Sequence, residues 1–360
     1  MAGQSDRATR IDVSKLGPQV GERVPDFSLK DQTGKTQTLQ SIIGRRGAVL
    51  VFVRSTDWCP YCKTQLVELQ GRAQSLQAQG LGIAVISYDS QEAHARFSQE
   101  RRISFPLLAD VGSETIKRFG LLNPVPARAL GPDKDNPAVK ALVQKYVSVV
   151  NPTARMVGIA FPGTFILDRQ GRVTSRFFED FYIERTTMAS LMVRAGANNE
   201  EIAATKVSTG HLEVTTYTTD REIAPGNRFS IVLEITPKPG VHVYAPGAEN
   251  YRIVSLDIPS QPFLRADAMT YPASEIYHFK PLDERVPVYQ KPFRLVRELV
   301  LDGQPQAQAA YRGKDSLTIT GTLEYQACDD RICFNPVALP LSWTVGLRPL
   351  VRGPAPAQNR

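Results

Sequence analysis

The sequence predicts two domains of different fold class: an α/β layered domain, with helices packed on a sheet, followed by an all-β sandwich. The chain has 360 residues, and a single hydrophobic core seldom grows beyond about 250–300 residues. Apolar runs typical of buried strands alternate with helical patterns up to about residue 195. After Gly210, short strands of alternating polarity and many turn residues follow, which is typical of an antiparallel sandwich.

The composition is that of an ordinary globular protein, with 42% hydrophobic and 22% charged residues. The net charge is +7, but no run of five or more like charges occurs, which argues against a nucleic-acid-binding protein. No apolar stretch reaches the roughly 18–20 residues of a membrane helix. The polar N-terminus lacks the apolar core of a signal peptide. We therefore expect either a cytoplasmic protein or one whose leader is absent from this sequence.

The α/β domain is expected over residues 21–197, after a flexible arm of residues 1–20. The apolar runs at 47–53 and 81–87 are typical of strands buried on both faces. Apolar positions at spacings of four and three share one face of a helix between these strands: Cys62, Leu66, Leu69, Ala73 and Leu76. Further along the chain we expect helices at 92–101, 140–150 and 186–194, a strand, turn and helix within 105–120, an irregular Pro-rich insertion at 123–138, and a hairpin of 164–168 with 172–178.

The sandwich is expected over residues 210–347, with a linker at 198–209 and a flexible tail at 348–360. Its clearest strands have alternating polarity and are bounded by Pro-Gly and similar turns. These strands are expected at 211–217, 229–236, 316–325 and 338–345.

Four cysteines fall into two close pairs, a pattern that indicates redox chemistry or metal binding. The first pair, Cys59 and Cys62, follows a buried strand and begins an amphipathic helix. Because unpaired N–H groups and the helix dipole favour an anion there, we expect Cys59 to be the exposed, more acidic nucleophile. Cys62, one turn later on the apolar face, would resolve a mixed disulfide. Pro60 suits the first helical turn, where its missing N–H breaks no bond.

A zinc site and a purely structural bridge are the alternatives for this pair. Zinc needs four ligands, but no second CxxC and no closely spaced pair of histidines completes a set. The four histidines stand at positions 94, 211, 242 and 278, without metal-ligand spacing. We therefore expect neither a metal nor an organic cofactor.

Four motifs occur in order along the first domain: GERVPDFSL from Gly21, RSTDWCPYCKTQL from Arg54, FPLLAD from Phe105 and PGTFILD from Pro162. Together they resemble the peroxiredoxin and AhpC/TSA branch of the thioredoxin superfamily, over about residues 20–195. The resemblance implies a thioredoxin fold, with helices packed on a central sheet, and an oxidoreductase activity.

Two positions depart from the peroxidase members of that family. Thr56 and Cys59 match the family's Pro-x-x-x-Thr-x-x-Cys loop, but Phe52 replaces its proline. Pro162 stands where those members carry an arginine that holds the peroxide, so we expect weak peroxidase activity. A proline there is similar to the cis-proline loop of thioredoxins and TlpA-like reductases, which receives the partner peptide; a simple strand-edge turn is the alternative. The resemblance implies substrate-positioning roles for Thr56, Trp58, Pro60, Tyr61 and Pro162.

The second pair, Cys328 and Cys333, could simply close a hairpin loop. However, PGVHVYAP from Pro239, YPASEI from Tyr271 and YQACDDRICFNP from Tyr325 resemble, in this order, the N-terminal domain of the interchange protein DsbD. The resemblance implies an immunoglobulin-like fold over residues 210–347 and a pair that passes electrons to periplasmic disulfide proteins. Closing so short a loop removes little chain entropy, so we expect a redox-active, solvent-accessible pair on the rim of the sandwich.

The sequence therefore predicts a thiol–disulfide oxidoreductase that acts on protein thiols or disulfides through Cys59 and Cys62. Cys328 and Cys333 would relay electrons to or from this pair or to a separate partner. The alternatives are a peroxidase that uses Cys59 and a redoxin with a non-catalytic docking β-domain. Protein partners, and a membrane electron donor, are the expected sources and acceptors of electrons, and nucleic acid is not. The DsbD-like domain favours the periplasm, although no signal peptide is visible.

Overall fold

The computed structural model describes residues 12–147, 151–179, 181–196, 204–279 and 283–353. The chain divides into two compact units: one runs to Met188 and also includes the chain from Leu350 onward, and the other is Ala189–Pro349. About half of the expected arm, linker and tail lies outside the described residues. Each unit is considered by itself below.

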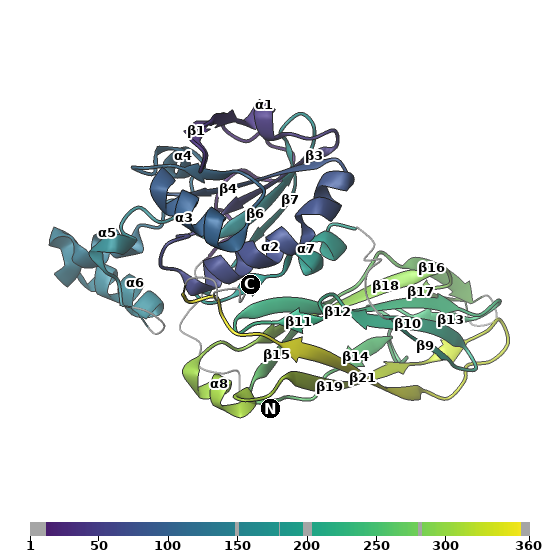
Figure 1. The fold of residues 1–360 in the computed structure, drawn as a ribbon. Coiled ribbons are helices and arrows are strands. Elements are labelled where there is room, and N and C mark those ends of the chain that lie inside the picture. Colours follow the sequence, from purple (N-terminus) through teal and green to yellow (C-terminus); the bar gives the residue numbers. More distant parts are fainter. Residues whose placement is uncertain (1–11, 148–150, 180, 197–203, 280–282, 354–360) are drawn as a thin grey trace, which may run out of the picture. The chain divides into compact units, whose positions relative to one another are not determined.

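The first unit is built on a single mixed sheet (Figure 1). Its strands are β1 (Ser28–Lys30), β2 (Thr36–Thr38), β3 (Gly47–Phe52), β4 (Leu81–Ser87), β5 (Leu107–Ala109), β6 (Gly163–Leu167) and β7 (Val173–Phe178). The short β8 (Arg185–Thr186) follows further along the chain and is not a strand of this sheet. The sheet order is β2-β1-β5-β4-β3-β6-β7. Every residue of β3 is buried, because the run GAVLVF is apolar on both faces of a central strand. β3 and β4 are parallel, so their carboxyl ends meet at one edge of the sheet.

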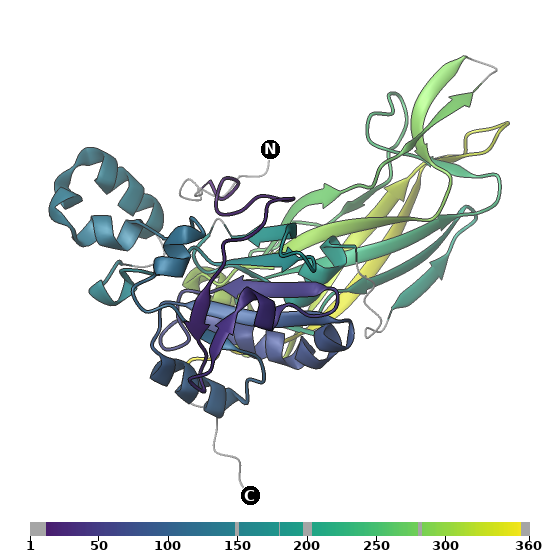
Figure 2. The same cartoon turned by 90° about the horizontal axis from the view of Figure 1, so that it is seen from above.

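Helices surround this sheet, and their bounds are α1 (Leu39–Ile42), α2 (Pro60–Ala78), α3 (Gln91–Arg101), α4 (Glu114–Arg118), α5 (Val125–Leu130) and α6 (Pro137–Val147). Short 3-10 turns occupy Pro132–Asp135 and Ala154–Met156. The expected buried face of α2 is confirmed from Cys62 to Leu76. The stretch at 123–138 is less irregular than expected, because prolines occupy the first turns of α5 and of the Pro132–Asp135 turn instead of breaking them. In Figures 1 and 2, α5 and α6 project from the side of the sheet.

The core of the first unit contains a cluster of three aromatic rings at the end of β3, the strand that precedes the cysteine pair. Phe52, at the end of β3, lies 4.9 Å from Phe119 and 6.0 Å from Phe165, measured between ring centroids. All three side chains are buried. Such tilted and edge-on pairs stabilise a core beyond the area they bury, so the strand that leads to Cys59 ends on a rigid support.

The chain near the C-terminus packs on the first unit, whereas a flexible tail was expected from residue 348. Leu350 is buried, and the backbone N–H of Val351 donates to Thr64 Oγ1 of α2 at 2.9 Å. The apolar pair Leu350-Val351 explains the difference, because burial compensates for the ordering of this short segment. Residues 354–360 lie outside the described part of the chain.

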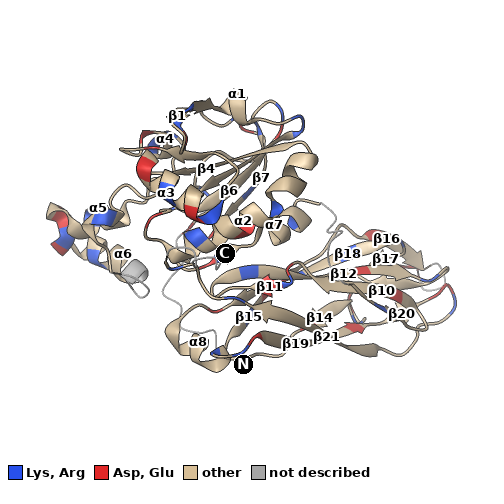
Figure 3. Ribbon diagram, in the orientation of Figure 1, with Lys and Arg blue, Asp and Glu red and all other residues tan. Residues whose placement is uncertain are grey.

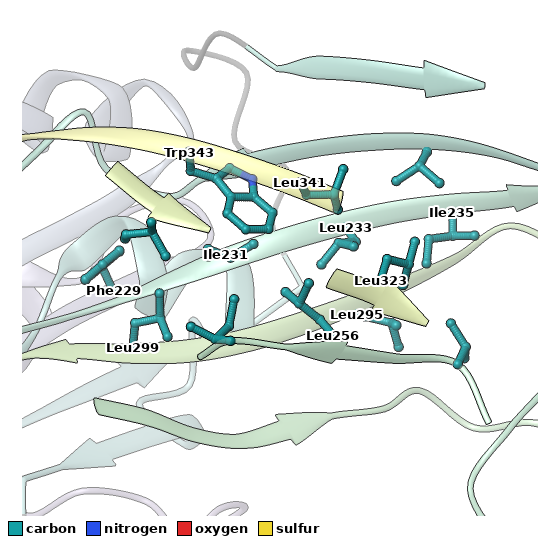
Figure 4. Packing of buried hydrophobic residues seen from close by; sticks show 14 of the residues in the cluster. Phe229, Ile231, Leu233, Ile235, Leu256, Leu295, Leu299, Leu323, Leu341 and Trp343 are labelled. Atoms are coloured by element: carbon teal, nitrogen blue, oxygen red, sulfur yellow. The ribbon is translucent and has the colours of Figure 1, made fainter. Parts of the chain in front are cut away.

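The second unit is a β-sandwich. After α7 (Met188–Arg194) come β9 (Thr205–Ser208), β10 (Leu212–Thr218), β11 (Glu222–Ile223), β12 (Asn227–Pro237), β13 (His242–Tyr244), β14 (Ser255–Asp257), β15 (Leu264–Thr270), β16 (Glu275–Phe279), β17 (Glu284–Tyr289), β18 (Phe293–Leu301), α8 (Pro305–Tyr311), β19 (Ser316–Tyr325), β20 (Ala327–Cys328) and β21 (Val337–Leu347). The strand orders are β15-β18-β12-β10-β9, β11-β21-β19-β14 and β16-β17-β13-β20. Side chains from β12, β18, β19 and β21 interdigitate in its core (Figure 4). The expected sandwich is confirmed.

One strand lies within the expected linker. β9 pairs antiparallel with β10, with Val207 opposite Val214. The turn residues between the two strands return the chain on itself, and the Thr-Lys-Val-Ser run has the polarity of an edge strand. Residues 198–203, the first half of the expected linker, lie outside the described residues.

Candidate active site

The first cysteine pair lies at the junction of β3 and α2. Cys59 is the N-cap of α2 in an extended conformation, and Pro60 lies in the first turn. The backbone N–H of Cys62 donates to Cys59 Sγ at 3.3 Å. The sulfur thus takes the place of the oxygen that usually caps a helix. The expected position of the pair at a helix N-terminus is confirmed.

Both sulfurs of this pair are buried, which contradicts the expectation of an exposed Cys59. Cys59 and Cys62 are each 0% exposed. The helical pattern places Cys59 relative to its own helix, but neighbours from elsewhere in the chain, such as Tyr182, also lie beside the pair. Tyr61 and Tyr182 are both close enough to interact electrostatically with Cys59. Access of a partner therefore requires local opening.

Two buried arginines lie beside the pair. Arg185 Nη2 donates to Cys62 Sγ at 3.3 Å, and the Arg54 guanidinium stacks over the Tyr182 ring, 3.3 Å from its centroid. Both guanidiniums donate to the Tyr182 carbonyl, which holds them in place. A buried cation is stable only with an anion or hydrogen-bond acceptors beside it. The site is therefore built to hold negative charge on sulfur.

That charge resides preferentially on Cys62. Burial raises the pKa of the Cys62 thiol, but the hydrogen bond from Cys59 and the charges of Arg185 and Arg54 outweigh burial and bring this pKa well below its ordinary value. Burial, and then the hydrogen bond to Cys62, raise the pKa of Cys59. Two thiols this close titrate as a pair with one shared charge. The expectation that Cys59 is the more acidic thiol is wrong, because Arg185 contacts the other sulfur.

A buried polar network holds the loop before the pair. The Asp89 carboxylate accepts from Ser55 Oγ at 2.8 Å and from the Thr56 backbone N–H at 2.7 Å. Thr56 Oγ1 also lies 3.0 Å from His94 Nδ1. Burial lowers the pKa of His94, more than Asp89 raises it, so the ring is neutral. The Thr56 hydroxyl therefore already has hydrogen-bond partners in Asp89 and His94.

The other residues expected to position substrate lie around the loop. Trp58 Nε1 donates to Tyr88 Oη at 2.9 Å, and the Arg155 guanidinium lies 5.5 Å from the Trp58 ring centroid. Burial raises the pKa of the half-buried Tyr61. Trp58, Tyr61 and Tyr88 thus form a group of aromatic side chains around the loop that carries Cys59, and the Arg155 guanidinium lies beside it.

The expectation of a cis peptide bond before Pro162 is wrong. None of the peptide bonds among the described residues is cis, so Pro162 is trans. It is buried, and it directly precedes β6, where Gly163 pairs with Phe52 at the end of β3. The resemblance to a cis-proline loop rested on a short motif, and a proline preceding a strand needs no cis bond to turn the chain.

The second pair forms a disulfide between Cys328 and Cys333. Cys328 is buried on β20, next to β13, and Cys333 is exposed. The Tyr244 hydroxyl lies 2.9 Å from Cys328 Sγ and 3.4 Å from Cys333 Sγ. Burial, followed by the neighbouring Tyr251, raises the pKa of Tyr244 strongly, so this hydroxyl stays protonated and can donate to either sulfur.

An aromatic cluster supports this disulfide. The Tyr244 and Tyr251 rings stack at 3.9 Å between centroids, and Tyr251 Oη donates to Glu284 at 2.6 Å. His242, opposite Cys328 in the β13–β20 ladder, packs on Tyr277 at 4.5 Å. One sulfur is thus held on a rigid aromatic surface while the other faces solvent, an arrangement suited to attack at the exposed sulfur.

Neither a metal cluster nor a membrane helix is found in the part of the chain that the structure describes. No group of three or more His, Cys, Asp or Glu side chains there could hold a metal ion. No helix there is long and apolar enough to span a bilayer. Charged residues are dispersed over both units (Figure 3).

Comparison with protein families identifies both units. Residues 20–176 match the AhpC/TSA family, and residues 213–339 match the N-terminal domain of the thiol:disulfide interchange protein DsbD. The first unit thus resembles the redoxins of the thioredoxin superfamily. The expected fold classes, a thioredoxin fold followed by an immunoglobulin-like sandwich, are thereby confirmed.

Curated relatives of the first unit include peroxiredoxins. The chloroplastic peroxiredoxin Q of Populus jackii is 32% identical over 111 residues, which are 31% of this chain and 49% of that protein. The 1-Cys peroxiredoxin PER1 of Zea mays is 26% identical over 145 residues, 33% of this chain and 62% of that protein. The chain thus spans about half the length of the first of these relatives and somewhat more of the second.

Solved structures with a similar fold include a peroxidoxin, BcpB, from Mycobacterium tuberculosis, with a TM-score of 0.35 and 22% identity over 46% of this chain and 89% of that one. A thiol peroxidase from Chromobacterium violaceum matches with a TM-score of 0.34 and 19% identity. This match covers 47% of this chain and 80% of that one.

Sequence reasoning missed the charged groups around the first pair and its loop. Asp89, which holds the loop, lies two residues after the end of β4, and the carboxyl ends of parallel neighbours β3 and β4 meet, so its position in the sequence was a usable signal. Arg54 stands within the quoted cysteine motif. Arg185 had no local signal, because 123 residues separate it from Cys62. Tyr244, likewise, is brought to the second pair only by the β13–β20 pairing.

Proposed function

We propose that the protein is a thiol–disulfide oxidoreductase that exchanges disulfides with partner proteins through Cys59 and Cys62. The observation that carries the proposal is the shared environment of the two sulfurs. Both lie within one helical turn, and Arg185 stabilises a thiolate on the second. A peroxidase with one reactive cysteine needs no second thiol in this position, whereas exchange needs two.

The chemistry follows from the shared proton. In the reduced pair, the Cys59 thiol transfers its proton to the Cys62 thiolate as Cys59 attacks one sulfur of the partner disulfide. The partner's other sulfur leaves as a thiolate and takes that proton from Cys62. The Cys62 thiolate then attacks Cys59 Sγ, which forms the Cys59–Cys62 disulfide and releases the second partner sulfur as a thiolate. Two electrons pass to the partner, and each step is reversible, so the direction depends on the relative potentials.

Binding of the partner must open the site, because neither sulfur is exposed. The half-buried Trp58 and Tyr61 are the proposed surface for the partner chain, and Pro60 and Thr56 shape the loop that presents Cys59. Main-chain hydrogen bonds to an extended segment are a recurring way in which proteins hold a peptide partner.

In the second unit, exchange would begin at Cys333, the exposed sulfur. An incoming thiolate forms a bond to Cys333 Sγ, and Cys328 leaves as a thiolate that accepts a hydrogen bond from the Tyr244 hydroxyl. We propose that this pair relays electrons to or from Cys59–Cys62 or a separate partner protein, with a membrane donor as a further source. The match to the DsbD N-terminal family supports protein thiol partners and a periplasmic setting. A docking role without exchange is the competing reading of this unit.

Trapping tests the proposal. The Cys62→Ser variant is expected to accumulate a mixed disulfide between Cys59 and a protein disulfide substrate, whereas Cys59→Ser is expected to accumulate none. Combining Cys62→Ser with Cys328→Ser and Cys333→Ser removes the second pair as a source of adducts. Absence of any mixed disulfide at Cys59 would refute the exchange function.

A peroxidase is the second candidate, and one observation favours it. Pro162 replaces the arginine of the peroxidase members, but Arg54 and Arg185 both lie beside the cysteines. Guanidiniums there could stabilise the leaving oxygen of a peroxide. Against this, Thr56 Oγ1 already has hydrogen-bond partners in Asp89, at 3.3 Å, and His94, at 3.0 Å. Peroxide consumption by the Cys62→Ser variant, compared with the native protein, separates the two functions.

A further inference from the structure

The loop between β3 and α2 has two side-chain attachments to the rest of the unit, and they differ in strength. At one, Ser55 Oγ and the Thr56 backbone N–H donate to the buried Asp89 carboxylate at 2.8 and 2.7 Å. At the other, the exposed Asp57 carboxylate pairs with Arg155 at 2.9 Å. Buried hydrogen bonds to a charge are costly to break, whereas an exposed ion pair contributes little. The Asp57 attachment is therefore the weaker of the two.

Arg155 makes two further contacts with this loop, and both involve Trp58. Its guanidinium lies 5.5 Å from the centroid of the Trp58 ring. Its carbonyl accepts a hydrogen bond from the Tyr88 hydroxyl, which in turn accepts one from Trp58 Nε1 at 2.9 Å. Trp58 directly precedes Cys59 in the chain. Arg155 therefore holds the residue next to the first cysteine from two directions.

The residue after Arg155 supports the same aromatic side chain from below the surface. Met156 is buried in a small apolar cluster with Val125 and Ile159, and Trp58 and Tyr182 pack against this cluster. The Tyr182 carbonyl also accepts hydrogen bonds from both arginines beside the cysteine pair. The cluster thus supports the residue before the first cysteine together with the residue that anchors the arginines.

We propose that Arg155 and Met156 form a gate for the disulfide exchange proposed above: their release from Asp57 and Trp58 frees the loop and exposes Cys59 to a partner disulfide. The inference rests on the proposed function for the identity of the partner, but the opening is a property of the reduced protein alone. Because both sulfurs of the pair are buried, a reagent reacts only with the open conformation, and its rate scales with the population of that conformation.

The ion pair makes the gate sensitive to salt. The Arg155 and Asp57 side chains are 57% and 46% exposed, so added salt screens their attraction, whereas the buried bonds to Asp89 are screened much less. Losing the ion pair and the ring contact in Arg155→Ala is expected to raise the open population about three- to tenfold. Asp57 keeps a second cation in this variant, because Arg96 Nη2 lies 3.8 Å from its carboxylate.

The experiment measures how fast iodoacetamide, a neutral reagent, alkylates Cys59 in the reduced full-length protein at one pH, with the modified peptides resolved by mass spectrometry. The native protein, Arg155→Ala and Met156→Ala are compared at low and at high salt. Lys140→Ala is the matched control, because this exposed lysine of α6 also forms an ion pair, with Asp135 at 3.1 Å. A melting curve of each variant establishes that it is folded.

The proposal predicts that Arg155→Ala labels Cys59 about three- to tenfold faster than the native protein at low salt, and that Met156→Ala labels it at least as fast. Salt should accelerate labelling of the native protein but not of Arg155→Ala, and Lys140→Ala should match the native protein. Labelling no faster than native in either folded variant, or native labelling that is independent of salt, would overturn the gate.

Two further results remain decisive. If Met156→Ala does not fold, Arg155→Ala decides alone, since it changes only an exposed side chain. A protein whose Cys59 is labelled as predicted, but which forms no mixed disulfide with a protein substrate, would contradict the proposed function and still support the gate. The two failures can therefore be told apart.

Discussion

Replacing Arg185 by glutamine should make the Cys59–Cys62 pair markedly more reducing. The guanidinium donates to Cys62 Sγ at 3.3 Å in a fully buried site. A hydrogen bond to a charged group contributes about 1.5–3 kcal/mol, and the variant loses this in the reduced state but not in the disulfide. Since about 1.4 kcal/mol corresponds to 30 mV for a two-electron couple, the reduction potential should fall by roughly 30–60 mV.

Equilibration with glutathione redox buffers, followed by alkylation and gel separation of the two forms, measures this potential. Arg176→Gln is the matched control, because Arg176 belongs to the same unit and donates to backbone carbonyls, including that of Ser14 at 2.8 Å. The control should leave the potential unchanged. An Arg185→Gln potential within error of the native value would refute the reasoning that Arg185 stabilises the thiolate.

The same variant should change how pH affects the reduced protein. The pKa of Cys62 lies well below its ordinary value of 9.0, so its ionisation stabilises the fold fully above pH 9.0, and this stability is lost as the pH falls through the folded pKa. Cys59, with a raised pKa, contributes in the opposite sense, and its stabilisation is lost as the pH rises above 9.0. Arg185→Gln should therefore flatten the rise in melting temperature of the reduced protein below pH 9.0, whereas an unchanged slope would contradict the assignment.

Three further predictions concern the second pair and the fold. Replacing Cys328 and Cys333 by serine should abolish exchange at this unit while lowering its stability by no more than about 2 kcal/mol, since the closed loop is short; urea unfolding and an exchange assay measure the two effects. Tyr244→Phe should slow reduction of this disulfide by dithiothreitol about tenfold, a loss of about 1.4 kcal/mol, and Tyr325→Phe, a buried tyrosine of the same unit, should not. Gly47→Ala should reduce the melting temperature strongly, because a Cβ there would lie 1.8 Å from the Leu167 carbonyl oxygen and Gly47 has a φ of 136°; a native melting curve would contradict the packing.

The sequence was informative wherever local pattern determines structure. The apolar run at Gly47–Phe52 and the spacing of the buried face of α2 predicted the strand and helix that place Cys59 and Cys62. The alternating polarity of 316–325 likewise predicted β19. These elements depend on periodicity, which is written in neighbouring residues.

Sequence reasoning failed where the environment of a side chain depends on distant contacts. The burial of Cys59 and the acidity of Cys62 follow from Arg185 and Tyr182, which reach the site from the segment after β7. No spacing rule connects them to the CxxC. The prediction of a cis peptide bond before Pro162 failed for a related reason, because a short motif match carries no information on the backbone that surrounds it.

The central claim is that Cys59 and Cys62 act together in exchange with protein disulfides, and the most direct measurement compares two substrates for one protein. Second-order rate constants are measured for the reduced protein with a protein disulfide and with hydrogen peroxide, for the native chain and for Cys62→Ser. The account predicts that native turnover is supported by the protein disulfide and that Cys62→Ser stops at a mixed disulfide on Cys59. Rapid peroxide reduction that persists in Cys62→Ser, with no mixed disulfide to protein, would contradict it.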